Sequence, residues 1–221
     1  MKAIVFLSVM SILILSIGIT AARTDDAGTA YITLIGHASL KIKTSGGLVI
    51  YVDPYHPGDY SEKADIILIS HEHSDHNKIG LVTQNEGCRV LRVKDTSNKD
   101  GTYNSFNIKG VLIEPVPAAN RNHTMETTNG FVISFDGLKV YHASDTSKLP
   151  QMAELKSKGI DYAFFPIDGQ YNMGPDEAAE CATMVGAKHN IPFHYFSADV
   201  SKFKPANLLS LPYGGTITVA R

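Results

Sequence analysis

The chain has 221 residues, 43% of them hydrophobic, which is enough for one domain with a substantial core. Its formal net charge is −2, which argues against a nucleic-acid partner bound through bulk electrostatics. Its two cysteines, Cys88 and Cys181, are too few for a disulfide scaffold, and the sequence leaves open whether they are bridged.

The N-terminus carries an uncharged, predominantly apolar stretch at residues 3–22, between Lys2 and Arg23. Small residues at positions 20–22 favour a secretory signal that is cleaved after Ala22. About 20 apolar residues also suffice to span a bilayer, so an uncleaved anchor, with membrane association through residues 3–22, is the alternative. With Lys2 on the inside, both alternatives predict that residues 23–221 form an extracytoplasmic domain, either secreted or membrane-anchored.

After this stretch, short apolar runs alternate with helical patterns. We expect strands at residues 31–35, 40–43, 48–52, 66–70, 89–93, 108–115, 131–135, 138–141, 162–167, 191–196 and 216–219. Helices are expected at residues 76–84, 149–158 and 175–188, the last with Pro175 at its first position. Asp136-Gly137 predicts a two-residue hairpin turn. Two groups of strands with helices between them indicate one α/β domain, and no linker divides residues 23–221.

The hexapeptide His71-Glu72-His73-Ser74-Asp75-His76 directly follows an apolar, isoleucine-rich run at residues 66–69. Such a run predicts a buried strand, so the hexapeptide lies where that strand ends. Imidazole and carboxylate groups suit Zn²⁺ and similar divalent ions. There His71 and His73 can turn to one ion, while Asp75 and His76 reach a second. A solvated polar loop is the weaker alternative, because three of the nine histidines stand within six residues.

The order His-x-His-x-Asp-His resembles the signature of the metallo-β-lactamase superfamily. The later ligand positions of that superfamily are matched in order by His123, Asp145 and His194, and Asp53 is similar to the acidic residue that braces the histidine loop. Residues 36–39 and 173–179 resemble the branch that contains L-ascorbate-6-phosphate lactonases and N-acylphosphatidylethanolamine-hydrolysing phospholipase D enzymes. The resemblance extends from about residue 32 to about residue 195.

The resemblance implies a four-layer αββα sandwich, in which two sheets pack face to face between helix layers. It also implies a site with two divalent metal ions, for which zinc is expected and manganese stays open. His71, His73 and His123 would hold the first ion, Asp75, His76 and His194 the second, and Asp145 would bridge them. Asp53 would fix an imidazole tautomer from outside the ligand set.

These roles predict a metal-dependent hydrolase in which a hydroxide bridging the ions cleaves an ester, lactone or phosphodiester of a small molecule. Asp75 could additionally pass a proton to the leaving group. Two alternatives stay open: a phospholipid-directed phosphodiesterase at the membrane, and a non-catalytic metal-binding surface domain. The substrate is open as well, because the lactonase branch is usually cytoplasmic whereas this chain is expected to be exported.

Three further residues are candidates for contact with the substrate. His37 stands at a turn after Gly36, His142 stands three residues before Asp145, and Tyr195 stands beside a proposed ligand. A hydrogen-bonded structural histidine is the alternative for His37 and His142, and aromatic packing is the alternative for Tyr195. The loop at residues 168–172 follows an expected strand and is expected to shape the pocket. One departure from the family is Ser144, where the superfamily usually has glycine before the bridging aspartate.

Overall fold

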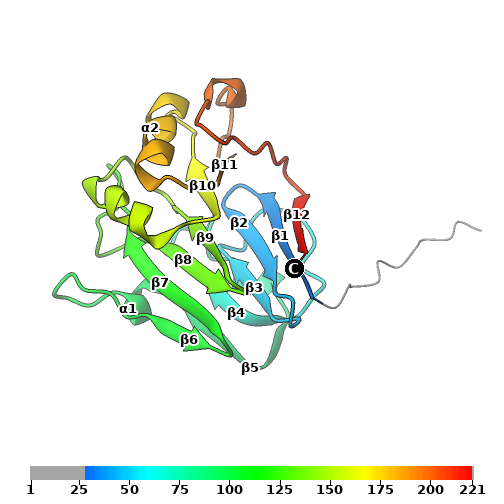
Figure 1. The fold of residues 1–221 in the computed structure, drawn as a ribbon. Coiled ribbons are helices and arrows are strands. Elements are labelled where there is room, and N and C mark those ends of the chain that lie inside the picture. The colour runs from blue at the N-terminus through cyan, green and yellow to red at the C-terminus, as the bar shows by residue number, and fades with distance from the viewer. Residues whose placement is uncertain (1–27, 221) are drawn as a thin grey trace, which may run out of the picture.

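The computed structural model describes residues 28–220, which fold into two six-stranded sheets that face each other (Figure 1). The first sheet has the order β12-β1-β2-β3-β4-β5. Its strands are β1 (Thr29–Gly36), β2 (Ser39–Lys43), β3 (Val49–Val52), β4 (Ala64–Leu68), β5 (Gln84–Leu91) and β12 (Gly215–Ala220).

The second sheet repeats this plan with the order β11-β10-β9-β8-β7-β6. Its strands are β6 (Phe106–Ile108), β7 (Val111–Pro117), β8 (Asn129–Phe135), β9 (Leu138–His142), β10 (Tyr162–Pro166) and β11 (His189–Phe193). In each sheet, antiparallel strands are followed by a set of three parallel strands: β3 to β5 in the first and β9 to β11 in the second. The parallel strands of both sheets deliver loops from their carboxyl ends, where ligand sites form in α/β proteins.

The main core lies between the sheets. Alternate residues of each strand point inward, so that Ile32 and Leu34 of β1 meet residues such as Ile133 of β8 and Phe164 of β10 in one buried apolar cluster. Burial of this cluster is the main term that holds the two sheets together. The packing leaves the loops at the strand ends to carry the polar groups.

Helices cover mainly the second sheet. Helix α2 (Pro175–Val185) and the 3₁₀ helix η2 (Pro150–Lys158) pack on its outer face, where Cys181 is a buried free thiol, and α2 lies beside β10 in Figure 1. Cys88 is also free, so the two cysteines are not bridged. Within residues 28–220, the other helical segments are short: η1 (Ile79–Leu81), α1 (Val93–Thr96) and η3 (Val200–Lys202). The predicted αββα sandwich is confirmed, with a thin helical layer on the first sheet.

Two predicted elements were wrong in form. The helix expected at residues 76–84 is only the single turn η1, because the preceding loop is tied down by a hydrogen bond from the Lys78 backbone N–H to the Pro54 carbonyl. The strand expected at residues 108–115 is interrupted by a turn, where Lys109 and Gly110 have φ angles of 52° and 89°. The hairpin turn at Asp136-Gly137 is confirmed, with φ angles of 49° and 75°.

The predicted signal or anchor, residues 1–22, lies outside the described residues. Among residues 28–220, no helix is both long and apolar enough to cross a membrane.

Candidate metal centre

The predicted ligands meet at one edge of the two facing sheets. Each stands in a loop that follows a strand: the histidine hexapeptide follows β4, His123 follows β7, Asp145 follows β9 and His194 follows β11. Residues up to 123 positions apart in the sequence are therefore brought together by topology, since His71 and His194 belong to opposite sheets.

The first predicted set is assembled as expected. One ligand atom each from His71, His73 and His123 lies within 4.8 Å of the others. Nε2 of His123 is 3.2 Å from Nδ1 of His73, and these two atoms face each other without any carboxylate between them. His71 and His123 are buried, whereas His73 is exposed, so this side of the centre opens to solvent.

The second set is also assembled. Nε2 of His76 and Nε2 of His194 lie 3.4 Å and 3.3 Å from the same oxygen, Oδ1 of Asp145. Oδ2 of Asp75 lies 4.0 Å from Nε2 of His76. Asp145 also groups with His71 and His76 within 4.8 Å, which places its carboxylate between the two sets, as a bridging ligand requires.

Four buried atoms at this point have no hydrogen-bond partner within the described part of the chain: Nε2 of His71, His76 and His194, and Oδ1 of Asp145. Each unsatisfied buried polar atom ordinarily costs about 1–3 kcal/mol. Four such atoms directed at one small volume are balanced if their lone pairs bind a divalent cation, because nitrogen and oxygen ligands of this type are those of zinc sites. The residues therefore fit the metal ions that the sequence predicts.

Asp53 braces the centre from the carboxyl end of β3. Its Oδ2 accepts hydrogen bonds from Nδ1 of His76 at 2.9 Å and from Oγ of Ser70 at 2.6 Å, and its Oδ1 accepts one from the Ser70 backbone N–H at 2.7 Å. Oγ of Ser70 is in turn 3.0 Å from Nδ1 of His71. With Nδ1 occupied in this way, both rings direct Nε2 to the metal centre.

Two supporting residues were not assigned by sequence reasoning. Oδ2 of Asp168 lies 3.1 Å from Nδ1 of His194, and Oδ1 of Asn120 lies 3.1 Å from Nδ1 of His123. Asp168 stands in the loop expected to shape the pocket, and its oxygens also accept hydrogen bonds from backbone N–H groups of residues 170–172. The signals that could have found them differ: Asn120 is a short polar side chain in the same loop as His123, whereas Asp168 follows the strand next to that of His194.

The charges of the centre suit a cation. Burial lowers the pKa of His71 to about 3 and also lowers the pKa of His123, so both imidazoles are neutral and can bind metal. Burial opposes the charge of His76 as well, but the carboxylates of Asp145 and Asp53 outweigh it and raise the pKa of His76 to about 9. Burial would raise the pKa of Asp145, yet the surrounding imidazoles hold it below its usual value. The carboxylates therefore give the centre a negative electrostatic potential, while the rings of His71 and His123 are neutral.

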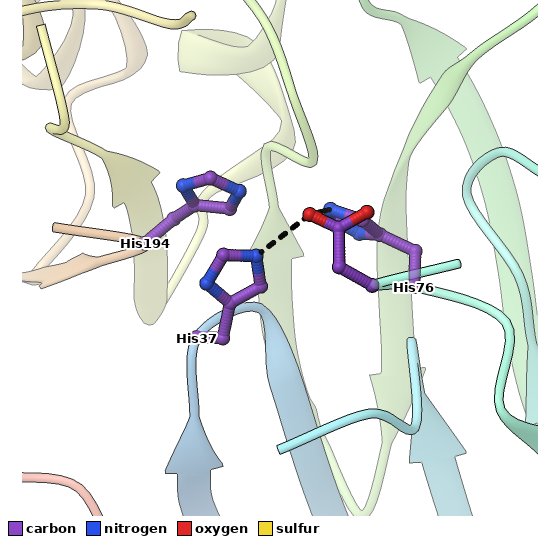
Figure 2. Close-up of side chains that lie close together, drawn as sticks. His37, His76 and His194 are labelled. Atoms are coloured by element: carbon purple, nitrogen blue, oxygen red, sulfur yellow. Dashed lines mark hydrogen bonds and ion pairs between the residues drawn. The ribbon is translucent and has the colours of Figure 1, made fainter. Parts of the chain in front are cut away.

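His37 lies within the second set, as Figure 2 shows for its ring beside those of His76 and His194. Its Nε2 is 3.2 Å from Oδ2 of Asp75, and its ring centroid is 3.7 Å from that of His194. The backbone N–H of His194 also donates to the His37 carbonyl at 3.0 Å. The turn between β1 and β2 is therefore part of the centre, and His37 lies where a substrate-contacting residue is expected.

The other two substrate candidates are placed differently. For His142 the structure favours the structural alternative over substrate contact, because the residue is fully buried: its Nε2 lies 2.8 Å from the Ala38 carbonyl, and its Nδ1 accepts a hydrogen bond from the Ser144 N–H. With both nitrogens occupied inside the core, it is a structural histidine. Tyr195 stacks on Tyr213 with ring centroids 4.4 Å apart, which favours the aromatic-packing alternative.

Backbone strain gathers at the centre. Among residues 28–220, His37, Asp53, Ser144 and His194 have φ angles of 54°, 47°, 61° and 48°, in the left-handed region that side chains rarely adopt. Such residues collect at functional sites. Ser144 stands where the superfamily usually has glycine, which adopts this conformation without steric cost. The serine retains it and donates its N–H to His142.

A groove of about 880 Å³ opens beside the first set. Its lining includes His71, His73 and His123 and the charged side chains of Glu72, Lys94, Lys99 and Glu126. A small molecule can thus reach the predicted ligands from solvent.

Comparison with known proteins identifies the family. A model of the β-lactamase superfamily domain matches residues 31–194. The chain belongs to the metallo-β-lactamase superfamily. It is similar to a UPF0173 metal-dependent hydrolase of Pyrococcus furiosus, with 30% identity over 205 residues that cover 78% of this chain and 90% of the relative.

Solved structures agree. A Parabacteroides distasonis protein assigned as a metal-dependent hydrolase shares 32% identity with a TM-score of 0.69, covering 81% of this chain and 91% of its own. Igni18, a metallo hydrolase of Ignicoccus hospitalis, shares only 21% identity but has a TM-score of 0.70, with 87% and 99% of the two chains covered, and so supports the fold alone.

The predicted family, fold and enzyme class are thereby confirmed: the protein is a metal-dependent hydrolase of the metallo-β-lactamase superfamily with a His/Asp cluster able to bind metal. The narrower resemblance to ascorbate-phosphate lactonases and phospholipase D enzymes stays a prediction.

Proposed function

We propose that the protein uses two divalent metal ions, zinc by preference, to hydrolyse an ester, lactone or phosphodiester bond of a small molecule. The observation that carries the proposal is the convergence of the four unpartnered buried atoms of His71, His76, Asp145 and His194. A single cation would leave much of the ligand set unused, because His73 and His123 lie on one side of Asp145 and His194 on the other. The nitrogen-rich set favours zinc, and manganese is compatible with the same residue types.

Bound ions of this kind lower the pKa of water and neutralise negative charge that develops on the substrate. The residues around them hold and move protons. Oδ2 of Asp75 lies beside His37, whose hydrogen bond, as the largest effect, lowers the pKa of this half-buried carboxyl. Asp75 is therefore a carboxylate at neutral pH, so it can accept a proton from the attacking water and release it to the leaving group.

We also propose that the domain acts outside the cytoplasm, either secreted or anchored to a membrane. The support is the composition of residues 3–22, an apolar stretch without charge followed by small residues. Mass spectrometry of the N-terminus of the exported protein distinguishes a signal cleaved after Ala22 from a retained anchor. Full-length chain found free in the cytoplasm would contradict export.

Metal analysis tests the central proposal. Protein refolded with zinc should hold close to two equivalents, and His73→Ala should lose metal and abolish turnover. The matched control is His189→Ala, because His189 is an exposed histidine stacked on Tyr162 at the start of β11, far along the strand from His194. Absence of bound zinc in the wild-type protein would overturn the proposal.

Generic substrates separate the alternatives. Bis(p-nitrophenyl) phosphate, p-nitrophenyl acetate and a simple γ-lactone represent the three bond types, and a chelator should abolish turnover of any that is cleaved. A protein that binds two zinc ions but cleaves none of the three, and no phospholipid in vesicles, would instead be a non-catalytic metal-binding domain.

A further inference from the structure

Three aromatic side chains from three separate loops form a connected group at the ring pair His37–His194. The ring centroid of Phe196 is 5.1 Å from that of His37 and 5.0 Å from that of His194. Tyr55 lies 5.2 Å from His37 on the same measure, and Tyr171 lies 6.2 Å from Phe196. We call Tyr55, Tyr171 and Phe196 the aromatic rim.

Each residue of the rim is close in sequence to a residue of the metal centre. Tyr55 stands two residues after Asp53, and Tyr171 stands three residues after Asp168. Phe196 likewise stands two residues after a predicted ligand. Each loop thus first supplies a group of the centre and then places an aromatic ring beside it. Because the ligand geometry fixes these loops, the rings are held in place with them.

Phe196 is exposed to solvent and has a strained backbone, and its packing within the protein explains neither feature. Its side chain is 56% exposed, and its φ angle of 38° lies in the left-handed region, which is unusual for a bulky residue. Tyr171 is 42% exposed as well. An exposed aromatic ring on a strained backbone next to a catalytic cluster indicates a functional surface.

The two sides of the centre differ in polarity. The groove beside the first set carries charged groups of both signs, Lys94 and Lys99 together with Glu72 and Glu126. On the rim side, Lys78 lies 4.5 Å from the ring of Tyr55, and Arg121 lies 5.8 Å from that of Tyr171. These cations cover faces of the two tyrosines.

Within residues 28–220, Phe196 has no cation over its ring, and its ring makes T-shaped contacts with those of His37 and His194. A substrate bound at the centre therefore meets a polar, charged surface on one side and an apolar ring on the other.

We propose that the aromatic rim, with Phe196 at its centre, binds an apolar aryl or alkyl group of the substrate next to the bond that is cleaved. The inference rests on the proposed function, since it places the scissile bond at the metal centre. It narrows the substrate class to small esters, lactones or phosphodiesters that carry such a group. Phe196 is then a residue that determines specificity, through contact of its ring with that group.

A binding experiment tests the rim without requiring turnover. Phenylphosphonate and methylphosphonate offer the same oxygens to the metal ions and differ only in the apolar group. By calorimetry, zinc-loaded wild-type protein should bind phenylphosphonate about tenfold more tightly. Phe196→Ala should bring the two affinities close together and leave that for methylphosphonate nearly unchanged. Phe196→Asn is a second variant without the ring, because asparagine tolerates the left-handed conformation and thus preserves the fold.

The matched control is Leu208→Ala, an exposed apolar residue (47%) that pairs with Asn190 at the opposite end of β11 from His194. It should retain the wild-type preference. Equal affinity of wild-type protein for the two phosphonates, binding of neither, or a preference that survives both Phe196 variants would overturn the role of the rim while zinc binding stays intact. Failure of the proposed function would differ, because the wild-type protein would then take up no zinc or would cleave none of the generic substrates.

Discussion

Replacement of Asp53 by asparagine isolates the contribution of one buried carboxylate to the metal centre. Asp53 is fully buried and accepts three hydrogen bonds, two from Ser70 and one from Nδ1 of His76. In Asp53→Asn, an NH₂ group takes the place of one oxygen with little change in shape. The amide oxygen can keep the Ser70 backbone N–H, and the Ser70 hydroxyl can rotate to accept from the NH₂ group.

Nδ1 of His76 cannot adjust to the new NH₂ group in the same way. An NH₂ group facing Nδ1 makes that nitrogen an acceptor, so the neutral ring carries its proton on Nε2, the atom directed at the metal centre. A protonated Nε2 cannot bind a cation. Groups that orient metal-binding histidines are ordinarily worth about 10–100-fold in metal affinity, or about 1.4–2.7 kcal/mol. Loss of the buried Asp53–His76 pair should also destabilise the metal-free protein by about 3 kcal/mol.

Competition with a chromophoric chelator measures the zinc affinity, and urea unfolding measures the stability. Asp65→Asn is the matched control, since Asp65 is a buried carboxylate near the far end of β4 that accepts from the Val49 N–H and from Lys109. That control should lose stability but keep its zinc affinity. Zinc binding by Asp53→Asn within about twofold of the wild-type value would show that Asp53 does not set the tautomer of His76.

Two further changes probe other parts of the molecule. Asp168→Asn should lower the affinity for the second zinc ion about tenfold and leave the affinity for the first unchanged, because Asp168 contacts Nδ1 of His194 alone among the predicted ligands. A two-step calorimetric titration measures the two affinities, and an equal loss of affinity in both steps would contradict the prediction. A chain that begins at Arg23 should fold and bind as much zinc as the full-length protein, because every predicted ligand lies after residue 31; zinc analysis and circular dichroism of both forms check this, and a truncated chain that aggregates would refute it.

The cluster of predicted ligands could be recognised in the sequence because its signal is local. The hexapeptide with His71 and His76 follows an apolar run, and His123, Asp145 and His194 follow other strands in the order of the family pattern. Each of these residues can be recognised from the strand that directly precedes it. Parallel strands then bring their carboxyl ends to the same edge without further information.

The contact between Asp168 and His194 was harder to predict because it joins residues that are distant in the sequence. The two residues follow adjacent strands, but only the parallel register of β10 and β11 shows that their loops meet. The two alternatives for His142 could not be separated from the sequence for a related reason. It stands at a strand end like the predicted ligands, yet the turn between β1 and β2 brings the Ala38 carbonyl over it and encloses it in the core.

Local propensity failed where the centre itself constrains the chain. Residues 76–84 carry a helical pattern, but His76 at their start is held by Asp53, and the Lys78 N–H is bonded to the Pro54 carbonyl. Tertiary hydrogen bonds to a fixed loop outweigh the few tenths of a kcal/mol by which ordinary residues differ in helix propensity. In the same region Asp53 has a left-handed backbone conformation.

The distribution of the ligands links metal binding to the assembly of the whole domain. His71 and His76 belong to the first sheet, whereas His123, Asp145 and His194 belong to the second. The apolar core holds the sheets face to face, but at this edge it leaves buried nitrogen and oxygen atoms without partners. A cation that binds only the folded arrangement satisfies those atoms and favours the folded state by mass action. Strain and unsatisfied polar groups therefore concentrate at the candidate metal centre, while the rest of the core follows the ordinary alternation of buried strands.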